Sequence, residues 1–180
     1  EVITAVNKIT GAGYSLAPNY LELFMADNDI NPAANEIIFA LNSDGKQSQN
    51  WGNTTFLVHA AIGGSMTATD YGVGSGWAGT RTTRAMVEKF VKPGVTFDPA
   101  DVSTMDPRNV FYTDGQDIDI VDIGEFTNGY AVPKFSNMTS TGSTGSDLTH
   151  ADTDNPIFRL ADAYLMYAEA VLRGGTGGDI

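Results

Sequence analysis

Ionisable side chains that could perform chemistry occur together near the C-terminal end of this chain. His150 lies among Asp147, Asp152 and Asp154, so an imidazole and three carboxylates that could bind a metal ion share one short segment. No helix or strand is predicted around them, and a metal site needs its ligands spaced by a rigid element. A solvated acidic loop is therefore the favoured interpretation.

A second acidic segment invites a calcium interpretation. Its carboxylates belong to Asp114, Asp117, Asp119 and Asp122. The segment lacks the central glycine and the closing glutamate of an EF-hand loop. Ile118 and Ile120 alternate with the aspartates, which is typical of a half-exposed strand, and we favour that interpretation.

Other catalytic patterns find little support. The glycine-rich run 72–76 lacks the spacing and the lysine of a phosphate-binding loop, and the chain has no G-x-S-x-G nucleophile elbow. Without cysteine, disulfides, zinc–thiolate sites and cysteine nucleophiles are excluded. Paired carboxylates for glycoside hydrolysis stay open, because aspartate is abundant. A net charge of −12, from 22 acidic and 10 basic residues, argues against nucleic-acid binding.

Aromatic residues in loops are the more informative feature. Trp51, Tyr71 and Trp77 stand in segments rich in Gly, Asn and Ser, where an exposed ring can stack against the C–H face of a sugar. Asn53 and Asp70 are candidate partners for the sugar hydroxyls. The alternative is that the rings fill the base of the loops. We favour that alternative for Trp77, which a predicted helix follows, and leave both interpretations open for Trp51 and Tyr71.

The segment expected to organise the chain is a helix over residues 155–174. Asp154 or Asn155 can cap its N-terminus, Pro156 suits its first turn, and Gly174 suits its C-terminal end. One face is predicted from the helical spacing of Ile157, Leu160, Ala161, Tyr164, Leu165, Ala168, Val171 and Leu172. The opposite side is also largely apolar, so we expect cover on more than one side. We interpret residues 1–180 as a single partial domain, a fragment of a larger protein whose C-terminal helices are missing.

The other predicted elements are short. We expect helices over residues 2–10, from Pro18 to about Asn28, and from Thr82 or Thr83 to Val91. The buried face of the third helix is predicted from Met86, Val87, Phe90 and Val91. The best strand candidates are residues 36–41, 111–113, 118–123 and 130–135, with a turn at Asp114-Gly115. Residues 54–62 are predicted as a strand or an extended loop, and residues 136–153 as a mobile loop of low complexity.

Several segments carry a family resemblance. The run R-L-A-D-A-Y-L-M-Y-A-E-A (159–170), followed by R-G-G, resembles the hallmark helix of the SusD/RagB family of outer-membrane nutrient-binding lipoproteins. Segments that agree with this family in order are N-E-I-I-F-A-L (35–41), R-T-T-R-A-M-V-E-K-F (81–90), D-P-R-N (106–109), F-Y-T-D-G (111–115) and G-Y-A-V-P-K-F (129–135). The resemblance covers nearly the whole chain.

The predicted elements indicate a mainly α fold with long irregular loops and a few short strands. The resemblance implies that it is part of a tetratricopeptide-type α-superhelical scaffold. It also implies a non-enzymatic protein without a cofactor, which faces outward from the outer membrane on a lipid anchor outside these residues. Such a protein captures an oligosaccharide or another nutrient and delivers it to a TonB-dependent SusC-like transporter. Two rival classes remain: a secreted or periplasmic carbohydrate-active enzyme, and a pure interaction scaffold.

Overall fold

The computed structural model of the chain describes residues 1–98 and 101–177. Its regular structure consists mainly of helices, joined by long irregular segments. The helices are α1 (Val2–Gly11), α2 (Asn53–Ala60), α3 (Arg84–Val87) and α4 (Leu160–Leu172), and the strands are β1 (Ile37–Leu41), β2 (Arg81–Thr82), β3 (Tyr130–Ala131) and β4 (Asn155–Arg159). Single 3₁₀ turns cover Tyr20–Phe24, Ala34–Glu36, Ala68–Tyr71, Glu88–Phe90 and Val102–Thr104.

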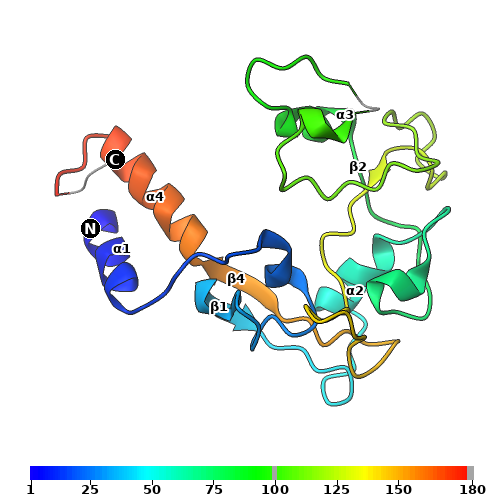
Figure 1. Cartoon of the computed structure of the whole chain (residues 1–180), viewed down its shortest axis with the longest axis horizontal. Coiled ribbons are helices and arrows are strands. Elements are labelled where there is room, and N and C mark those ends of the chain that lie inside the picture. Colours follow the sequence, from blue (N-terminus) through cyan, green and yellow to red (C-terminus); the bar gives the residue numbers. More distant parts are fainter. Residues whose placement is uncertain (99–100, 178–180) are drawn as a thin grey trace.

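The strands form two small antiparallel ribbons and, among the described residues, no closed sheet. β1 pairs with β4, and β2 pairs with β3. In Figure 1, α1 and α4 lie side by side at one end of the molecule, β1 and β4 lie in the middle, and α2 and α3 lie at the other end. None of the described helices combines the length and the hydrophobicity needed to cross a bilayer.

Buried side chains gather in small separate clusters rather than in one large core. Val6, Leu160 and Ala163 join α1 to α4. The other clusters are Leu23, Phe24 and Ala33; Val58, Ile62, Val73 and Ala151; and Val87, Met105, Ile118 and Tyr130. Because each cluster is small, the irregular segments depend strongly on hydrogen bonds for their shape.

The prediction for the C-terminal segment was wrong at its start. Residues 155–159 form strand β4, and the helix begins only at Leu160 with Arg159 as its N-cap. Neither predicted cap serves the helix: Asn155 lies in β4, and Asp154 accepts hydrogen bonds from the backbone of Ser43 and from Asn42. Arg159 bonds to the buried Glu36 at 2.7 Å, which fixes the end of β4 beside β1.

Within residues 1–180, the buried side of this helix matches the predicted face only at Leu160. The side packed against α1 carries Leu160 and Ala163, whereas Leu165 is 70% exposed and Leu172 is 78% exposed. Contact with α1 sets the side that is buried here, and much of the predicted apolar face stays exposed.

Residues 53–60 are a further correction, because they form helix α2 and not a strand or an extended loop. Thr54, Thr55 and Val58 are β-branched, which favours a strand locally. Their side chains are nevertheless buried on the helix, together with His59. Tertiary packing thus overrides local propensity here.

The predicted strands were only partly correct. β1 matches residues 36–41 closely, but Phe39 and Leu41 remain about half exposed. Residues 111–113 contribute only a single bridge, Tyr112 to Ala131, and residues 118–123 form no strand. Of residues 130–135, only Tyr130 and Ala131 are in a strand. The turn at Asp114-Gly115 is confirmed, with Gly115 at a φ of 68°.

The predicted helices elsewhere are largely confirmed but shorter. α1 corresponds to the predicted helix over residues 2–10, and the turn after Pro18 is a 3₁₀ turn that ends at Phe24 rather than near Asn28. α3 ends at Val87; Val87 is buried, but Met86 is half exposed. Neighbouring residues of a helix point in directions about 100° apart, so the side that buries Val87 leaves Met86 towards solvent.

Residues 136–153 are irregular, as predicted, but they are firmly tied to the rest of the chain. Buried Asn137 donates to the carbonyl oxygens of Gly72 and Asp147 and accepts from the backbone of Asp152. Gly72 cannot carry a side chain, because its φ is 74° and a Cβ atom would collide with the backbone of Asn137. This segment therefore has one defined path beside α2.

Candidate functional site

Five aromatic rings lie together around α2, and we call them the aromatic platform: Trp51, Phe56, His59, Trp77 and His150. The ring centres of Trp51 and Trp77 are 6.1 Å apart, and Phe56 lies 6.2 Å from Trp77. His59 stacks on Trp77 at 4.6 Å with an interplanar angle of 17°, and His150 lies 4.8 Å from Trp51. Each indole thus rests beside one histidine.

Trp77 is positioned by a tight contact between residues 76–80 and the C-terminal end of α2. The last carbonyl groups of a helix lack partners within it. Here His59 accepts from the N–H of Trp77 at 2.8 Å, and Ala60 accepts from those of Gly79 and Thr80. Gly76 allows this approach, since a Cβ atom there would collide with Ile62.

Trp51 is positioned by the loop that leads into α2. Gly52 is the N-cap of the helix and accepts from the N–H of Phe56. The Trp51 side of the platform is the more open one, because Trp51 is 61% exposed and Trp77 is 38% exposed. Two half-open indoles whose ring centres are 6.1 Å apart can bind adjacent sugar rings of an oligosaccharide.

The other predicted site residues lie differently. Tyr71 packs half-buried against the cluster around Val58 and Ile62, and in the described part of the chain it has no ring contact with either indole. Burial, with Tyr112 and Asp70 nearby, raises the pKa of its hydroxyl. Asp70 is exposed beside it. The side chain of Asn53 bonds internally, donating to Ser43 and accepting from Asn155.

Sequence reasoning missed three members of the platform. Phe56 and His59 stand three residues apart, which places them on one face of a helix, but this signal is visible only if the segment is recognised as helical. His150 drew attention only as a metal-ligand candidate. The expectation that Trp77 fills the base of its loop holds for one face of its ring, which covers buried His59. The other face of the ring stays open.

The two acidic segments serve local structure. Asp147 accepts from the N–H groups of Thr149 and His150, and Asp152 from those of Gly45 and Ser146. In the other segment, Asp119 forms a two-pronged ion pair with Arg84. Within residues 1–98 and 101–177, no group of three His, Cys, Asp or Glu side chains is arranged to hold a metal ion.

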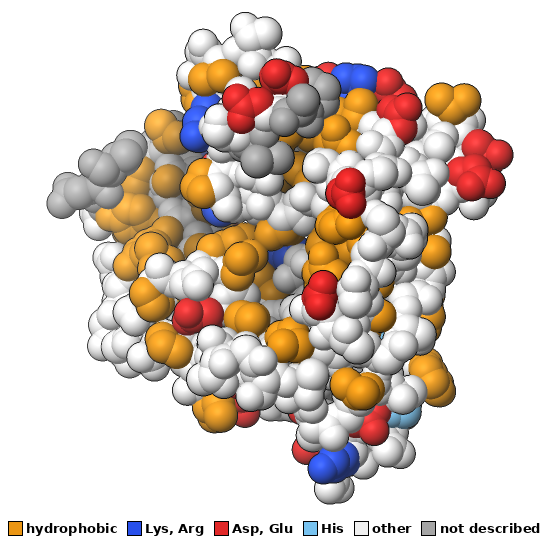
Figure 2. All heavy atoms as spheres, turned by 45° about the vertical axis from the view of Figure 1, so that its right-hand side comes forward, with side chains coloured by type: hydrophobic (Ala, Val, Ile, Leu, Met, Phe, Trp, Pro, Cys, Tyr) orange, Lys and Arg blue, Asp and Glu red, His pale blue; other side chains and the backbone are white. Residues whose placement is uncertain are grey.

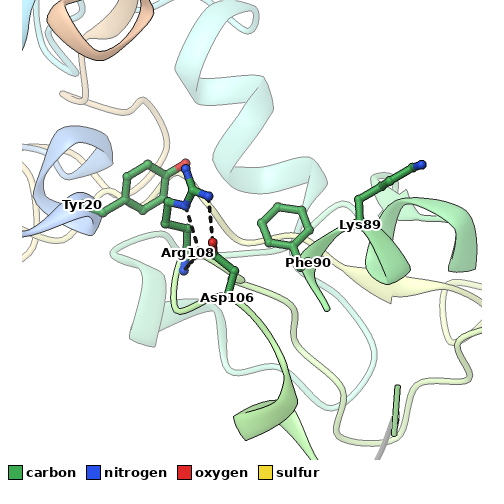
Figure 3. A pocket seen from close by; sticks show the side chains of 5 residues that line it. All are labelled: Tyr20, Lys89, Phe90, Asp106 and Arg108. Carbon is green, nitrogen blue, oxygen red and sulfur yellow. Dashed lines mark hydrogen bonds and ion pairs between the residues drawn. The ribbon is translucent and has the colours of Figure 1, made fainter. Parts of the chain in front are cut away.

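The main cavities lie away from the aromatic platform. One, of about 210 Å³, is lined by Tyr20, Lys89, Phe90, Asp106 and Arg108. Figure 3 shows Tyr20 and Arg108 side by side, Arg108 bonded to Asp106, and Lys89 pointing away. Hydrogen bonds from Arg108 lower the pKa of Asp106 to about 2, so this carboxylate stays ionised near neutral pH.

The comparisons with known proteins agree with the resemblance noted above. The model of the SusD family matches residues 102–178. The starch-binding protein SusD of Bacteroides thetaiotaomicron is 35% identical to this chain over 97% of its length. The chain belongs to the SusD family. It spans 38% of the length of that relative. His150 lies within the residues that match the SusD-family model, whereas Trp51 and Trp77 lie before the first matched residue.

Proposed function

We propose that this SusD-family chain is part of a non-enzymatic protein that captures glycans at the cell surface. The observation that carries the proposal is the pair of half-open indoles, Trp51 and Trp77, held 6.1 Å apart on a built support. Sugar rings bind such surfaces through their C–H faces, and neighbouring polar groups take the hydroxyls. An open platform also suits a long chain better than a closed cavity does.

The first glycans to consider are starch-derived oligosaccharides. The relative that is 35% identical is named as a starch-binding protein, and that name motivates the choice. By the same family relationship, we propose that the whole protein faces outward from the outer membrane on a lipid anchor and passes its ligand to a SusC-like TonB-dependent transporter. A tetratricopeptide-type α-superhelix is the proposed scaffold of that whole protein.

Tyr71 and Asp70 remain proposed contributors at the edge of the site, with Asn53 in a supporting role. Asp70 is exposed and can accept a sugar hydroxyl without leaving another partner unpaired. Asn53 acts best by holding the loop that carries Trp51, since its amide already bonds to Ser43 and Asn155. We expect a smaller loss of binding from Tyr71→Ala than from either tryptophan variant, because the Tyr71 ring is half-buried.

The test is calorimetric titration of the protein with maltoheptaose and a panel of other oligosaccharides. Binding through stacking and neutral hydrogen bonds should be weak to moderate and should change little between low and high salt. An affinity that falls steeply with salt would point to an ionic ligand and contradict the proposal. Chromatography of the titrated sugar must show it intact, because hydrolysis would place the protein among the enzymes.

The two rival classes are separated by further observations. A glycosidase needs two carboxylates facing one site, one of them with a raised pKa. Burial raises the pKa of Asp154, but its oxygens hold Ser43 and Asn42 rather than facing a cavity. A pure interaction scaffold would bind no member of a glycan array.

A further inference from the structure

His59 is buried at the centre of the aromatic platform, and both of its ring nitrogens face backbone carbonyl oxygens. Nδ1 lies 2.7 Å from the oxygen of Ser75, and Nε2 lies 2.9 Å from the oxygen of Thr149. The residue is only 2% exposed, so water does not replace either partner. Both distances are those of hydrogen bonds.

This arrangement selects one protonation form of the ring. A neutral imidazole carries a single N–H, so its other nitrogen would direct a lone pair at a carbonyl oxygen. The imidazolium carries two N–H groups and donates to both carbonyls. A buried polar group without a partner is costly, and a hydrogen bond from a charged donor is stronger than a neutral one.

Burial by itself disfavours a charged imidazole, and the contacts of His59 act against that cost. The indole of Trp77 stacks on the His59 ring at 4.6 Å and 17°, and an aromatic face attracts positive charge. The rest of α2 and residues 72–80 contain no ionisable side chain, and residues 145–153 contribute Asp147, His150 and Asp152. Asp147 lies 3.7 Å from the Nδ1 of His150, so negative charge stands in the same segment that accepts from His59.

The two accepting carbonyls belong to the two loops that complete the platform. Ser75 lies two residues before Trp77, and Thr149 lies next to His150, on which Trp51 rests. Loss of one proton from His59 would therefore break the bond to one of these loops. Release of the Ser75 loop would loosen Trp77, and release of the Thr149 loop would loosen His150, which contacts Trp51.

We propose that His59 is the positioning residue of the aromatic platform, and that its imidazolium form ties the two loops together beneath Trp77 and Trp51. The inference rests on the proposed glycan binding. It adds that the affinity for the glycan depends on the protonation of His59. Binding is strongest where His59 is doubly protonated, and it weakens once the ring has lost one of its two protons.

The protonation state can be measured without any sugar. Nitrogen-15 NMR of the ring nitrogens distinguishes an imidazolium from either neutral form, and contacts with the Trp77 ring protons identify His59. We expect both nitrogens to carry protons at neutral pH. A single protonated nitrogen would overturn the inference whatever the binding data show.

The consequence for binding is tested with maltoheptaose between about pH 5 and pH 9, a span that brackets the histidine range. We expect the affinity of the wild type to fall roughly tenfold as the pH rises, as for loss of one charge-assisted hydrogen bond. His59→Gln should bind roughly tenfold more weakly at low pH and show no such slope. His150→Gln separates the two histidines. Because His150 is itself a platform residue, only the slope of its pH profile is compared with the wild type, and that slope should be unchanged.

Two outcomes contradict the inference alone: a flat pH profile in the wild type, or a slope that persists in His59→Gln. A folded wild type that binds no glycan at any pH would instead contradict the proposed function. It would also remove the positioning role of His59, while the NMR experiment would still decide its protonation state.

Discussion

At the scale of single residues, the aspartates of this chain act mainly as acceptors for backbone N–H groups in loops. Asp147 illustrates this: its carboxylate accepts from His150 and Thr149, and these two hydrogen bonds lower its pKa below the ordinary 3.8. A lowered pKa in the folded state means that the charged form stabilises the loop above pH 3.8, and that this stabilisation is lost as the pH falls below it.

Replacing Asp147 by Asn removes the charge but keeps the shape of the side chain. We expect the amides of Thr149 and His150 to exchange several-fold faster with solvent at neutral pH, because a neutral acceptor holds them less tightly. Amide hydrogen exchange measured by NMR checks this. In the wild type, the protection of both amides should decline as the pH falls below 3.8.

Asp122→Asn provides the control for this experiment. Asp122 accepts from the N–H of Gly124, two residues later, in the loop before β3. Its replacement should leave the exchange of Thr149 and His150 unchanged. Equal protection in the wild type and in Asp147→Asn would show that the charge does not hold this loop.

At the scale of elements, the buried side of α4 is the feature most open to mutation. Leu160 is fully buried against α1, whereas Leu165 is 70% exposed. We expect Leu160→Ala to lower the free energy of unfolding by about 2–5 kcal/mol, and Leu165→Ala to lower it by less than about 0.5 kcal/mol in residues 1–180. Chemical denaturation followed by circular dichroism provides the comparison.

The second variant also tests the interpretation of the chain as a fragment. If further helices of a longer protein cover the exposed side of α4, Leu165→Ala should cost about 2–5 kcal/mol in that protein. A small cost in both settings would mean that Leu165 faces solvent throughout. A large cost already in residues 1–180 would contradict the packing of α4 described above.

Sequence reasoning recovered the elements that are marked locally and missed those that depend on distant partners. α1 was predicted because its apolar spacing matches its buried side, and β1 because a short apolar run bounded by polar residues is typical of a strand. β4 was missed because its strand form depends on pairing with β1, more than a hundred residues away, and Pro156 before an apolar run also suits a helix start. α2 was missed because its β-branched residues favour a strand until packing decides.

The candidate site was predictable to a similar degree. Trp51 and Trp77 were identified as candidates from the Gly-, Asn- and Ser-rich segments in which they stand. Their convergence with His59 was not foreseeable, because it depends on helix α2 and on the hydrogen bonds that attach residues 76–80 to its end. The separate position of Tyr71 has the same origin, since its ring packs on a cluster formed by distant segments.

At the scale of the whole molecule, apolar surface is abundant. Figure 2 shows hydrophobic side chains spread over much of one face, and the exposed side of α4 carries Leu165 and Leu172. Surfaces of this kind promote association. We therefore expect residues 1–180, expressed alone, to self-associate as the protein concentration rises, which sedimentation would reveal.

The paired variant Leu165→Glu and Leu172→Lys should reduce this self-association. Val121 and Ile123 are also strongly exposed, in a loop at the other end of the molecule (Figure 1), so Val121→Glu with Ile123→Lys is a control of equal charge. The control should leave self-association unchanged. A wild-type chain that stays monomeric as its concentration rises would contradict the expectation.

The central claim is that Trp51 and Trp77 form one glycan-binding surface, and calorimetry of single variants tests it most directly. We expect Trp51→Ala and Trp77→Ala each to weaken maltoheptaose binding by about 1–3 kcal/mol while the fold is retained. Phe39→Ala is the control, because Phe39 is half exposed on β1, outside the platform. Wild-type affinity in both tryptophan variants would contradict the account and place the binding site elsewhere in the protein.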